Sequence, residues 1–171
     1  MLSELVPGRG RGLLVALLRP PQTRRHLLDN AMTAELSPNG RWLAYGSPQS
    51  GQLEVYVTSY PGGRGRWQIS TGGGRQPAWS RDGRELFYRD FTGALIAVPV
   101  KTSPTFEAGP SRQLFSDPAY HGAGSSLSDR TYDVSLDGRR FVMIRNIEQP
   151  ARSIAVVQNW FDELRRRVPV N

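Results

Sequence analysis

A nine-residue pattern occurs three times in the sequence and constrains the fold more than any other feature. Each copy reads Ser, any residue, Asn or Asp, Gly, Arg, any residue, and then three mostly apolar residues. The copies begin at Ser37, Ser80 and Ser135, which lie 43 and then 55 residues apart. Self-similarity with a period of roughly 20 to 50 residues is typical of repeat architectures, in which each unit buries its apolar face against its neighbour.

The Asn-Gly or Asp-Gly pair in each copy predicts a β-hairpin, because these dipeptides tolerate the positive φ that tight hairpin turns favour at both central positions. The residues predicted to form these turns are Asn39, Gly40, Asp82, Gly83, Asp137 and Gly138. We assign them a structural role and not a metal-binding one, because no calcium-loop spacing surrounds them. The strand that follows each turn is nearly continuous in apolar residues, which indicates a strand buried on both faces.

Further strands follow the hairpins. Residues 53–60 and 94–100 each fit a third strand, and residues 67–70 and 112–116 fit a fourth. Four antiparallel strands in each period form the blade of a β-propeller. The sequence therefore predicts an all-β fold, a partial β-propeller of about three four-stranded blades with a short C-terminal helix. The predicted parts are an irregular or disordered segment over 1–23 and a propeller over 24–171, with blades at 31–71, 75–117 and 130–158 and the helix at 159–167.

Three segments outside this pattern carry separate expectations. Residues 25–28 fit the last strand of a blade that is otherwise missing. The second interval is 12 residues longer than the first, and the additional residues lie either in 102–111 or in 119–129. The segment 119–129 is either a surface loop without a role of its own or a loop that carries function. In 159–167, the apolar residues fall on one helical face, so this helix packs on the propeller or binds a partner.

Composition excludes several function classes. The chain has no cysteine, and its only histidines, His26 and His121, lie far apart, so neither thiolate chemistry nor a histidine-rich metal site is expected. The net charge is +7, but the arginines are scattered through turns and Lys101 is the only lysine, which argues against nucleic-acid binding. The longest apolar run, Leu13–Leu18, is too short to cross a membrane.

No catalytic motif is present in the sequence. The hydrolase motif G-x-S-x-G does not occur, and neither do the nucleotide loop or the catalytic loop of a protein kinase. Gly72-Gly73-Gly74 could approach a phosphate, but it precedes no predicted helix, which favours a turn between blades. We therefore expect no enzymatic activity and no cofactor.

The repeats resemble the C-terminal propeller of bacterial receptor-type serine/threonine kinases, which is built from TolB-like, WD-repeat-like blades. The resemblance extends from His26 to Val170, and it is carried by the runs Leu36–Tyr45, Glu54–Val57, Pro77–Gly83, Glu85–Tyr88, Tyr132–Ser135 and Asn159–Leu164. It implies a non-catalytic interaction or sensor module at the end of a larger bacterial protein. Two features depart from the family: the kinase is absent, and three blades are fewer than a closed propeller of this type contains.

The alternatives to a kinase-associated module are a propeller remnant of a prolyl-oligopeptidase-like or TolB-like envelope protein, and a truncated gene product without independent function. We expect a protein or peptide as the ligand, and self-association through the open blade faces. No nucleic acid and no membrane insertion by this chain are expected. If the resemblance to kinase propellers holds, the chain is periplasmic or extracytoplasmic, and otherwise it is cytoplasmic.

Overall fold

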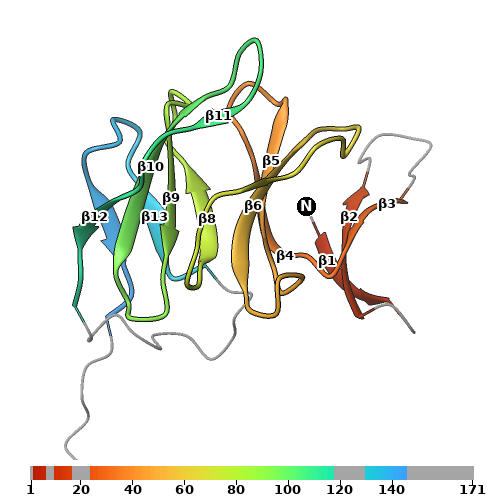
Figure 1. Cartoon of the computed structure of the whole chain (residues 1–171), viewed down its shortest axis with the longest axis horizontal. Coiled ribbons are helices and arrows are strands. Elements are labelled where there is room, and N and C mark those ends of the chain that lie inside the picture. The colour runs from red at the N-terminus through yellow and green to blue at the C-terminus, as the bar shows by residue number, and fades with distance from the viewer. Residues whose placement is uncertain (1, 7–9, 17–23, 118–129, 146–171) are drawn as a thin grey trace, which may run out of the picture.

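The computed structural model describes residues 2–6, 10–16, 24–117 and 130–145, and within them all regular structure is β-strand. The strands form four antiparallel sheets that stand side by side (Figure 1). The end of the predicted third blade, where 154–158 fits its third strand, lies outside the described residues, and so do the predicted helix at 159–167 and the segment 119–129.

Two sheets correspond to the first two repeats. The first has the order β4 (Met32–Leu36), β5 (Trp42–Ser47), β6 (Glu54–Ser59), β7 (Trp67–Gln68). The second has the order β8 (Arg75–Trp79), β9 (Glu85–Arg89), β10 (Leu95–Lys101), and its outermost position is shared by β11 (Glu107–Ala108) and β12 (Arg112–Phe115). Both pair with β10, and β11 lies in the segment 102–111, for which no strand was predicted.

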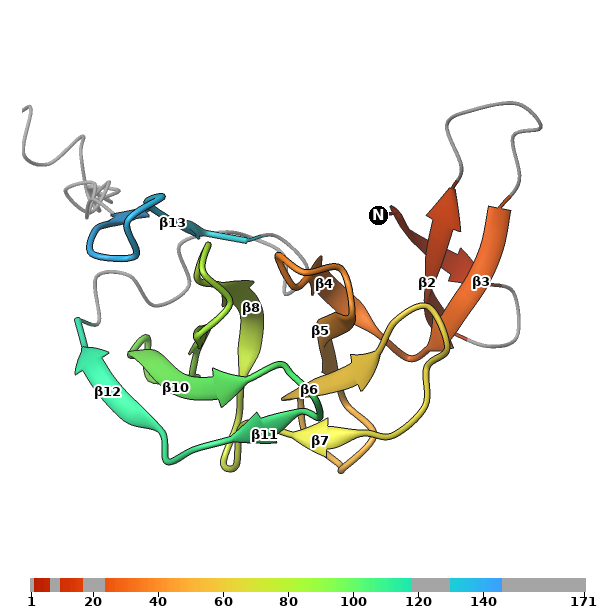
Figure 2. The same ribbon diagram turned by 90° about the horizontal axis from the view of Figure 1, so that it is seen from above.

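The third repeat contributes a described sheet of two strands, β13 (Tyr132–Val134) and β14 (Phe141–Met143). Seen from above, the first strands β4, β8 and β13 lie along one side of the array, and the outer strands β7, β11 and β12 lie along the other (Figure 2). This is the radial arrangement of propeller blades, in which the first strand of each blade is the innermost.

The N-terminal segment corrects one prediction. Residues 1–23 were expected to be irregular, but β1 (Leu2–Val6) and β2 (Gly10–Ala16) form a sheet with β3 (Arg24–Asp29). β3 is the last strand of a blade, as 25–28 predicted, and two further strands of that blade are present. A boundary at residue 24 is therefore wrong, because it separates hydrogen-bonded strands. The sheet is held by tertiary packing, with Leu13 only 2% exposed, and a repeat motif does not reveal such packing.

In the described ranges the core consists of three hydrophobic clusters, one at each junction between neighbouring sheets. We call the face of a sheet that points to the next sheet along the chain its front face, and the opposite face its rear face. In β5, Leu43 and Tyr45 lie on the rear face against Leu13, whereas Trp42 and Ala44 lie on the front face in the cluster with β8, β9 and β10. All six residues of β5 are buried, which confirms the prediction of a strand covered on both faces.

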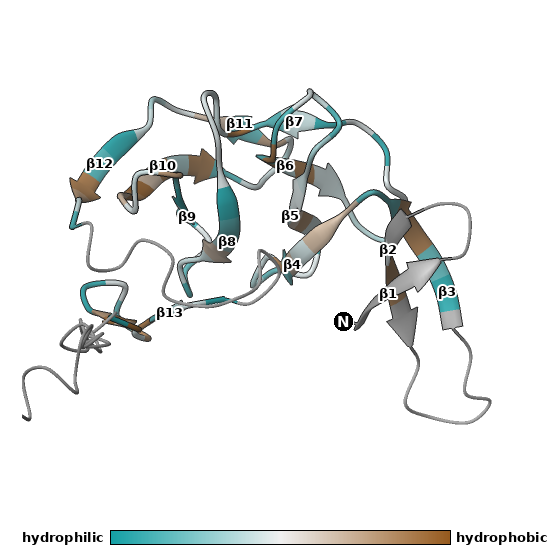
Figure 3. Cartoon of the chain, turned by 90° about the horizontal axis from the view of Figure 1, so that it is seen from below, coloured by the Kyte–Doolittle hydropathy of each residue, from teal (hydrophilic) through white to brown (hydrophobic). Residues whose placement is uncertain are grey.

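The outer strands are less apolar than the central ones. β10 is hydrophobic along most of its length, whereas β12 begins hydrophilic and ends hydrophobic (Figure 3). This difference places the core between the inner three strands of each blade and leaves the outer edge at the surface.

The three repeat turns share one geometry, which differs from the predicted one in one respect. Only the glycine has a positive φ, 68° at Gly40, 70° at Gly83 and 69° at Gly138, whereas the preceding Asn or Asp does not. The glycine N–H donates to the serine carbonyl at 2.8 or 2.9 Å in each copy. The Asn or Asp side chain instead accepts the N–H two residues further on at 3.1 Å, which fixes the turn without a second left-handed residue.

Candidate functional site

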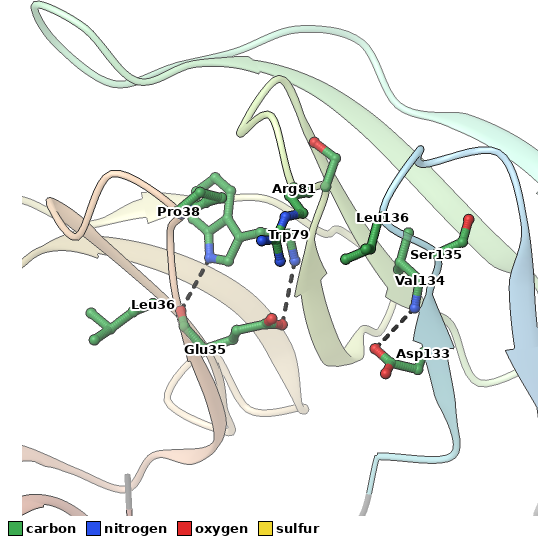
Figure 4. Close-up of a pocket in the computed structure, with 10 residues that line it drawn as sticks. Glu35, Leu36, Pro38, Trp79, Arg81, Asp133, Val134, Ser135 and Leu136 are labelled. Carbon is green, nitrogen blue, oxygen red and sulfur yellow. Dashed lines mark hydrogen bonds between the residues drawn. The ribbon is translucent and has the colours of Figure 1, made fainter.

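An open cavity of about 590 Å³ lies where the ends of the innermost strands β4, β8 and β13 meet (Figure 4). All three repeats contribute to it, each through the residue directly before the repeat serine and the residue directly after it. The lining residues are Glu35, Leu36, Pro38, Trp79, Ser80, Arg81, Asp133, Val134, Ser135 and Leu136. Because these strands are the innermost of each blade, we call this space the axial cavity.

The repeat turns position the rim of the axial cavity. In the first turn, Ser37 Oγ donates to Asn39 Oδ1 at 2.7 Å and accepts the N–H of Trp42 at 3.0 Å. The same two bonds recur in the second and third turns. The residue after each serine is therefore held in the same orientation three times, and these residues are Pro38, Arg81 and Leu136.

Part of the cavity surface is apolar and accessible. Leu36 is 37% exposed and Leu136 is 73% exposed, although each lies in a concave surface. Val134 is half-buried and Pro38 is exposed, and both line the same space. Accessible aliphatic side chains in a cavity provide a surface on which an apolar ligand group gains free energy by leaving water.

A charged network that includes two of the lining residues connects the three blades. Arg130 donates to Glu35 Oε2 at 2.6 Å and to Asp133 Oδ1 at 3.2 Å. Glu35 Oε2 also accepts the N–H of Trp79 at 3.3 Å, and the Trp79 indole N–H donates to the Glu35 carbonyl at 3.1 Å. Burial raises the pKa of Glu35 above its ordinary value, and the charge of Arg130 opposes this rise in pKa only in part.

A buried hydrogen-bond network fixes β13 against β8 and so fixes the third wall of the cavity. The Tyr132 hydroxyl donates to the Gln76 carbonyl at 2.7 Å, and burial raises the pKa of this hydroxyl. Thr131 donates to Gln76 Oε1 at 3.0 Å and accepts from Arg89 Nη1 at 2.8 Å. Gln76 adopts a φ of 57°, a conformation that non-glycine residues rarely adopt, so this junction holds it there.

The lining residues comprise two carboxylates, one guanidinium, two hydroxyls and apolar or aromatic side chains. They include neither histidine nor cysteine, and the two serine hydroxyls donate to Asp82 and Asp137 within their own turns. Among the described residues, no group of three potential ligands could hold a metal ion. Within the same ranges, no helix has the length and hydropathy needed to cross a membrane.

Gly72-Gly73-Gly74 lies in the connection between β7 and β8, at a junction between blades. The N–H of Gly73 donates to Glu54 Oε1 at 2.9 Å, so this donor is already used within the protein. The glycine run therefore serves the junction between two blades, as its sequence context favoured.

The predicted turn residues and the axial cavity are neighbours. All six lie in the three turns, which border one end of the cavity, and a side chain built on Gly83 would lie 3.7 Å from Pro38. Sequence reasoning missed Glu35 and Arg130, which are 95 residues apart. The apolar lining could have been found from the repeat alignment, because Leu36, Trp79 and Val134 each directly precede a repeat serine.

No known protein-family model matches this sequence, and no curated protein matches it. Solved structures do resemble it. A protein assigned as a 6-phosphogluconolactonase from Bacteroides uniformis has a TM-score of 0.50 and 16% identity, over 77% of this chain and 40% of that one. TolB from Acinetobacter baumannii has a TM-score of 0.41 and 15% identity, over 86% and 45%. The β-propeller domain of the Trilobed protease from Pyrococcus furiosus has a TM-score of 0.37 and 13% identity, over 67% and 52%.

Taken with the sheet order, this similarity assigns the chain to the all-β class as a partial β-propeller. Within that class, TolB is among the solved proteins that it resembles. The chain spans between 40% and 52% of these three solved chains. At this level of identity the similarity extends to the fold and not to activity.

Proposed function

We propose that this chain is a non-catalytic β-propeller module that binds a protein or peptide ligand in the axial cavity. The observation that carries the proposal is the cavity itself, to which three repeats contribute equivalent positions. Exposed leucines at its surface and a polar rim correspond to the usual composition of a binding surface, an apolar centre surrounded by polar groups.

The cavity favours a ligand with one projecting apolar side chain. Leu36, Val134 and Leu136 offer apolar contact, whereas Asp133 and Arg81 are exposed at the rim and can pair with polar groups of the ligand. Glu35 is already bonded to Arg130 and Trp79, so its carboxylate serves to position the wall and not to bind a second cation.

We further propose that the module belongs to a larger bacterial protein such as a receptor-type serine/threonine kinase, in which it acts as a sensor. The resemblance of the repeats to kinase-associated propellers supports this placement. A propeller part of a prolyl-oligopeptidase-like or TolB-like envelope protein is the alternative, and a truncated gene product without independent function is another. In the kinase arrangement, the module lies outside the cytoplasmic membrane.

The proposal is tested by selecting peptides from a random phage-displayed library on the immobilised full chain. The dissociation constants of the selected peptides are then measured by fluorescence anisotropy for the wild type and for Leu36→Asp and Leu136→Asp. We expect each substitution to weaken binding at least about tenfold, because a charge replaces an apolar contact at the centre of the site. Phe91→Asp is the matched control, since Phe91 is 36% exposed, like Leu36, but does not line the cavity. Equal peptide affinities for the wild type and all three variants would refute the proposal, and so would a selection that yields no peptide.

A further inference from the structure

One sheet has an apolar front face that is exposed. Ala44, Phe87 and Val142 occupy the same position in the three repeats, and each lies on the front face of its sheet. Ala44 is 0% exposed and Phe87 is 1% exposed, because the next sheet covers each of them, whereas Val142 is 77% exposed. The last described sheet, β13–β14, therefore has an apolar residue at the position that the next blade covers in the two earlier repeats.

Both faces of β14 are apolar. Phe141 and Met143 lie on the rear face and pack in the cluster with Phe87, with the rings of Phe87 and Phe141 5.0 Å apart. Val142 alternates with them, and Ile144, directly after the strand, is 57% exposed. A strand that is apolar on both faces is typical of one covered on both faces, but only the rear face of β14 is covered by described residues.

The junctions inside the chain indicate what covers such a face. At each of the three described junctions, the front face of one sheet packs against the rear face of the next. The complementary surface for the front face of β13–β14 is therefore the rear face of another blade.

The sheet β1–β3 has a rear face of this kind. Leu13 lies on its front face and is buried in the cluster with Leu43. The register shift beside it leaves Leu27 of β3 without a partner, so β2 itself alternates regularly and Leu14 points to the rear. His26 is the register partner of Leu14, and its side chain is 37% exposed. The hydrophobic clusters of the described ranges include Leu13 but not Leu14.

We propose that the chain associates with a second copy of itself, so that the front face of β13–β14 in one copy packs on the rear face of β1–β3 in the other. Each chain presents four sheets in its described part, so two copies supply eight. Propellers contain about four to eight blades, and a head-to-tail contact that closes into a ring covers both open faces. This inference does not depend on the axial cavity or its ligand.

The first test is the mass of the full chain in solution, measured by light scattering and by sedimentation velocity over a range of concentrations. We expect the wild type to have twice the 19.1 kDa mass of one chain. Val142→Asp should be monomeric, because it places a charge in the centre of the contact, and its exposed position lets the fold tolerate the change. Leu136→Asp is the matched control, with a side chain that is 73% exposed in the axial cavity, and it should remain a dimer.

The second test identifies the faces in contact and remains valid if a substitution impairs folding. Because the chain has no cysteine, Ile144→Cys and His26→Cys each introduce a unique thiol. After the two variants are mixed and treated with a short bis-maleimide, the crosslinked dimer should be several times more abundant than in either variant alone. A dimer from Ile144→Cys alone would show a front-to-front contact and overturn the proposal. A monomeric wild type at tens of micromolar would also overturn it, and so would an unreactive Ile144→Cys thiol in a monomer, which would show that the chain covers this face itself.

Discussion

At the scale of single residues, Asp82 shows how the repeat motif fixes a turn. Its Oδ1 accepts the Ser80 hydroxyl at 2.7 Å and the N–H of Arg84 at 3.1 Å. The hydrogen bond from Ser80 lowers the pKa of Asp82, and the bond from Arg84 adds to this effect. Asn39 makes the equivalent bonds in the first repeat without a charge, so the turn requires the side-chain oxygen and not its ionisation.

We predict that Asp82→Ala destabilises the protein by about 0.5–1.5 kcal/mol, which is the usual net contribution of a hydrogen bond to stability. Because the site is exposed, we expect a value in the lower part of this range. Asp82→Asn is the matched control and should remain close to the wild type at pH 7, since Asn39 already serves in the first turn. Urea denaturation of the three proteins provides the free energies of unfolding. An equal loss of stability in both variants would show that the charge, and not the acceptor oxygen, holds the turn.

The same pair of variants predicts a pH effect. The pKa of Asp82 is lower in the folded chain than its ordinary value of 3.8, so between these two values the unfolded chain binds more protons. The stabilisation by ionised Asp82 is therefore complete above pH 3.8 and is lost as the pH falls through the folded pKa. The wild type and Asp82→Asn should therefore have nearly equal stability at pH 7, and the wild type should lose stability relative to Asp82→Asn over this interval. A difference that stays constant from pH 7 to pH 3 would contradict this prediction.

The turn residues were predictable from the sequence because their chemistry is local: a Ser and an Asn or Asp two positions apart act within one turn. Glu35 and Arg130 were not, because their contact depends on the docking of β13 beside β4 and β8, which no local spacing encodes. The prediction of two left-handed residues in each turn was wrong for a different, local reason. The Asn or Asp oxygen accepts both the serine hydroxyl and the N–H two residues further on, and in the turn that these bonds hold the glycine alone is left-handed.

At the scale of elements, the connection between β7 and β8 joins two blades through a buried carboxylate. Glu54 is 1% exposed and accepts hydrogen bonds from the Gly73 N–H and from the Ser70 hydroxyl. Ser70 Oγ in turn accepts the N–H of Val55 at 2.8 Å. A Cβ on Gly74 would lie 2.3 Å from Ser70 Oγ, so there is no space for a side chain there.

We predict that Gly74→Ala destabilises the protein by about 1–3 kcal/mol, the usual cost of overpacking, because Ser70 cannot move without breaking its bonds to Glu54 and Val55. Gly62→Ala is the matched control, because a Cβ there would lie at an ordinary distance of 3.8 Å from Arg64. Thermal denaturation followed by circular dichroism measures both variants. If Gly74→Ala melts at the wild-type temperature, the hydrogen bonds of Ser70 are not as rigid as we infer.

The hairpin strands were predictable as elements because their apolar pattern and their turns are repeated, whereas β1, β2 and β11 were not. β1 and β2 contain no copy of the motif, and they are strands because their sheet packs on β4–β6 through residues such as Leu13. β11 has two residues and is exposed, so it has no periodicity to detect, and its pairing with β10 defines it. Tertiary contact, and not local propensity, decides these elements.

At the scale of the whole molecule, the sheets form a linear series in which each hydrophobic cluster belongs to one junction. In such proteins stability is approximately the sum of separate repeat and junction contributions. A substitution at one junction should therefore release the sheet at that junction and leave the distant sheets in place. Leu43 and Phe87, which are 0% and 1% exposed, lie at the first and the last of the described junctions.

We predict that Phe87→Ala and Leu43→Ala each cost about 2–5 kcal/mol but expose opposite ends of the chain. Hydrogen exchange read by mass spectrometry should accelerate in β13 and β14 for Phe87→Ala, because Phe141 loses its ring contact with Phe87, and Tyr132 and Met143 lose a large member of their cluster. For Leu43→Ala, exchange should accelerate in β2 and β3, which pack on Leu43 through the cluster that contains Leu13. β8–β10 should remain protected in Leu43→Ala, and β4–β6 in Phe87→Ala, so each variant is the control for the other. Uniform acceleration along the chain in both variants would mean that the sheets unfold as one cooperative unit, and the separation of the clusters would then have no energetic consequence.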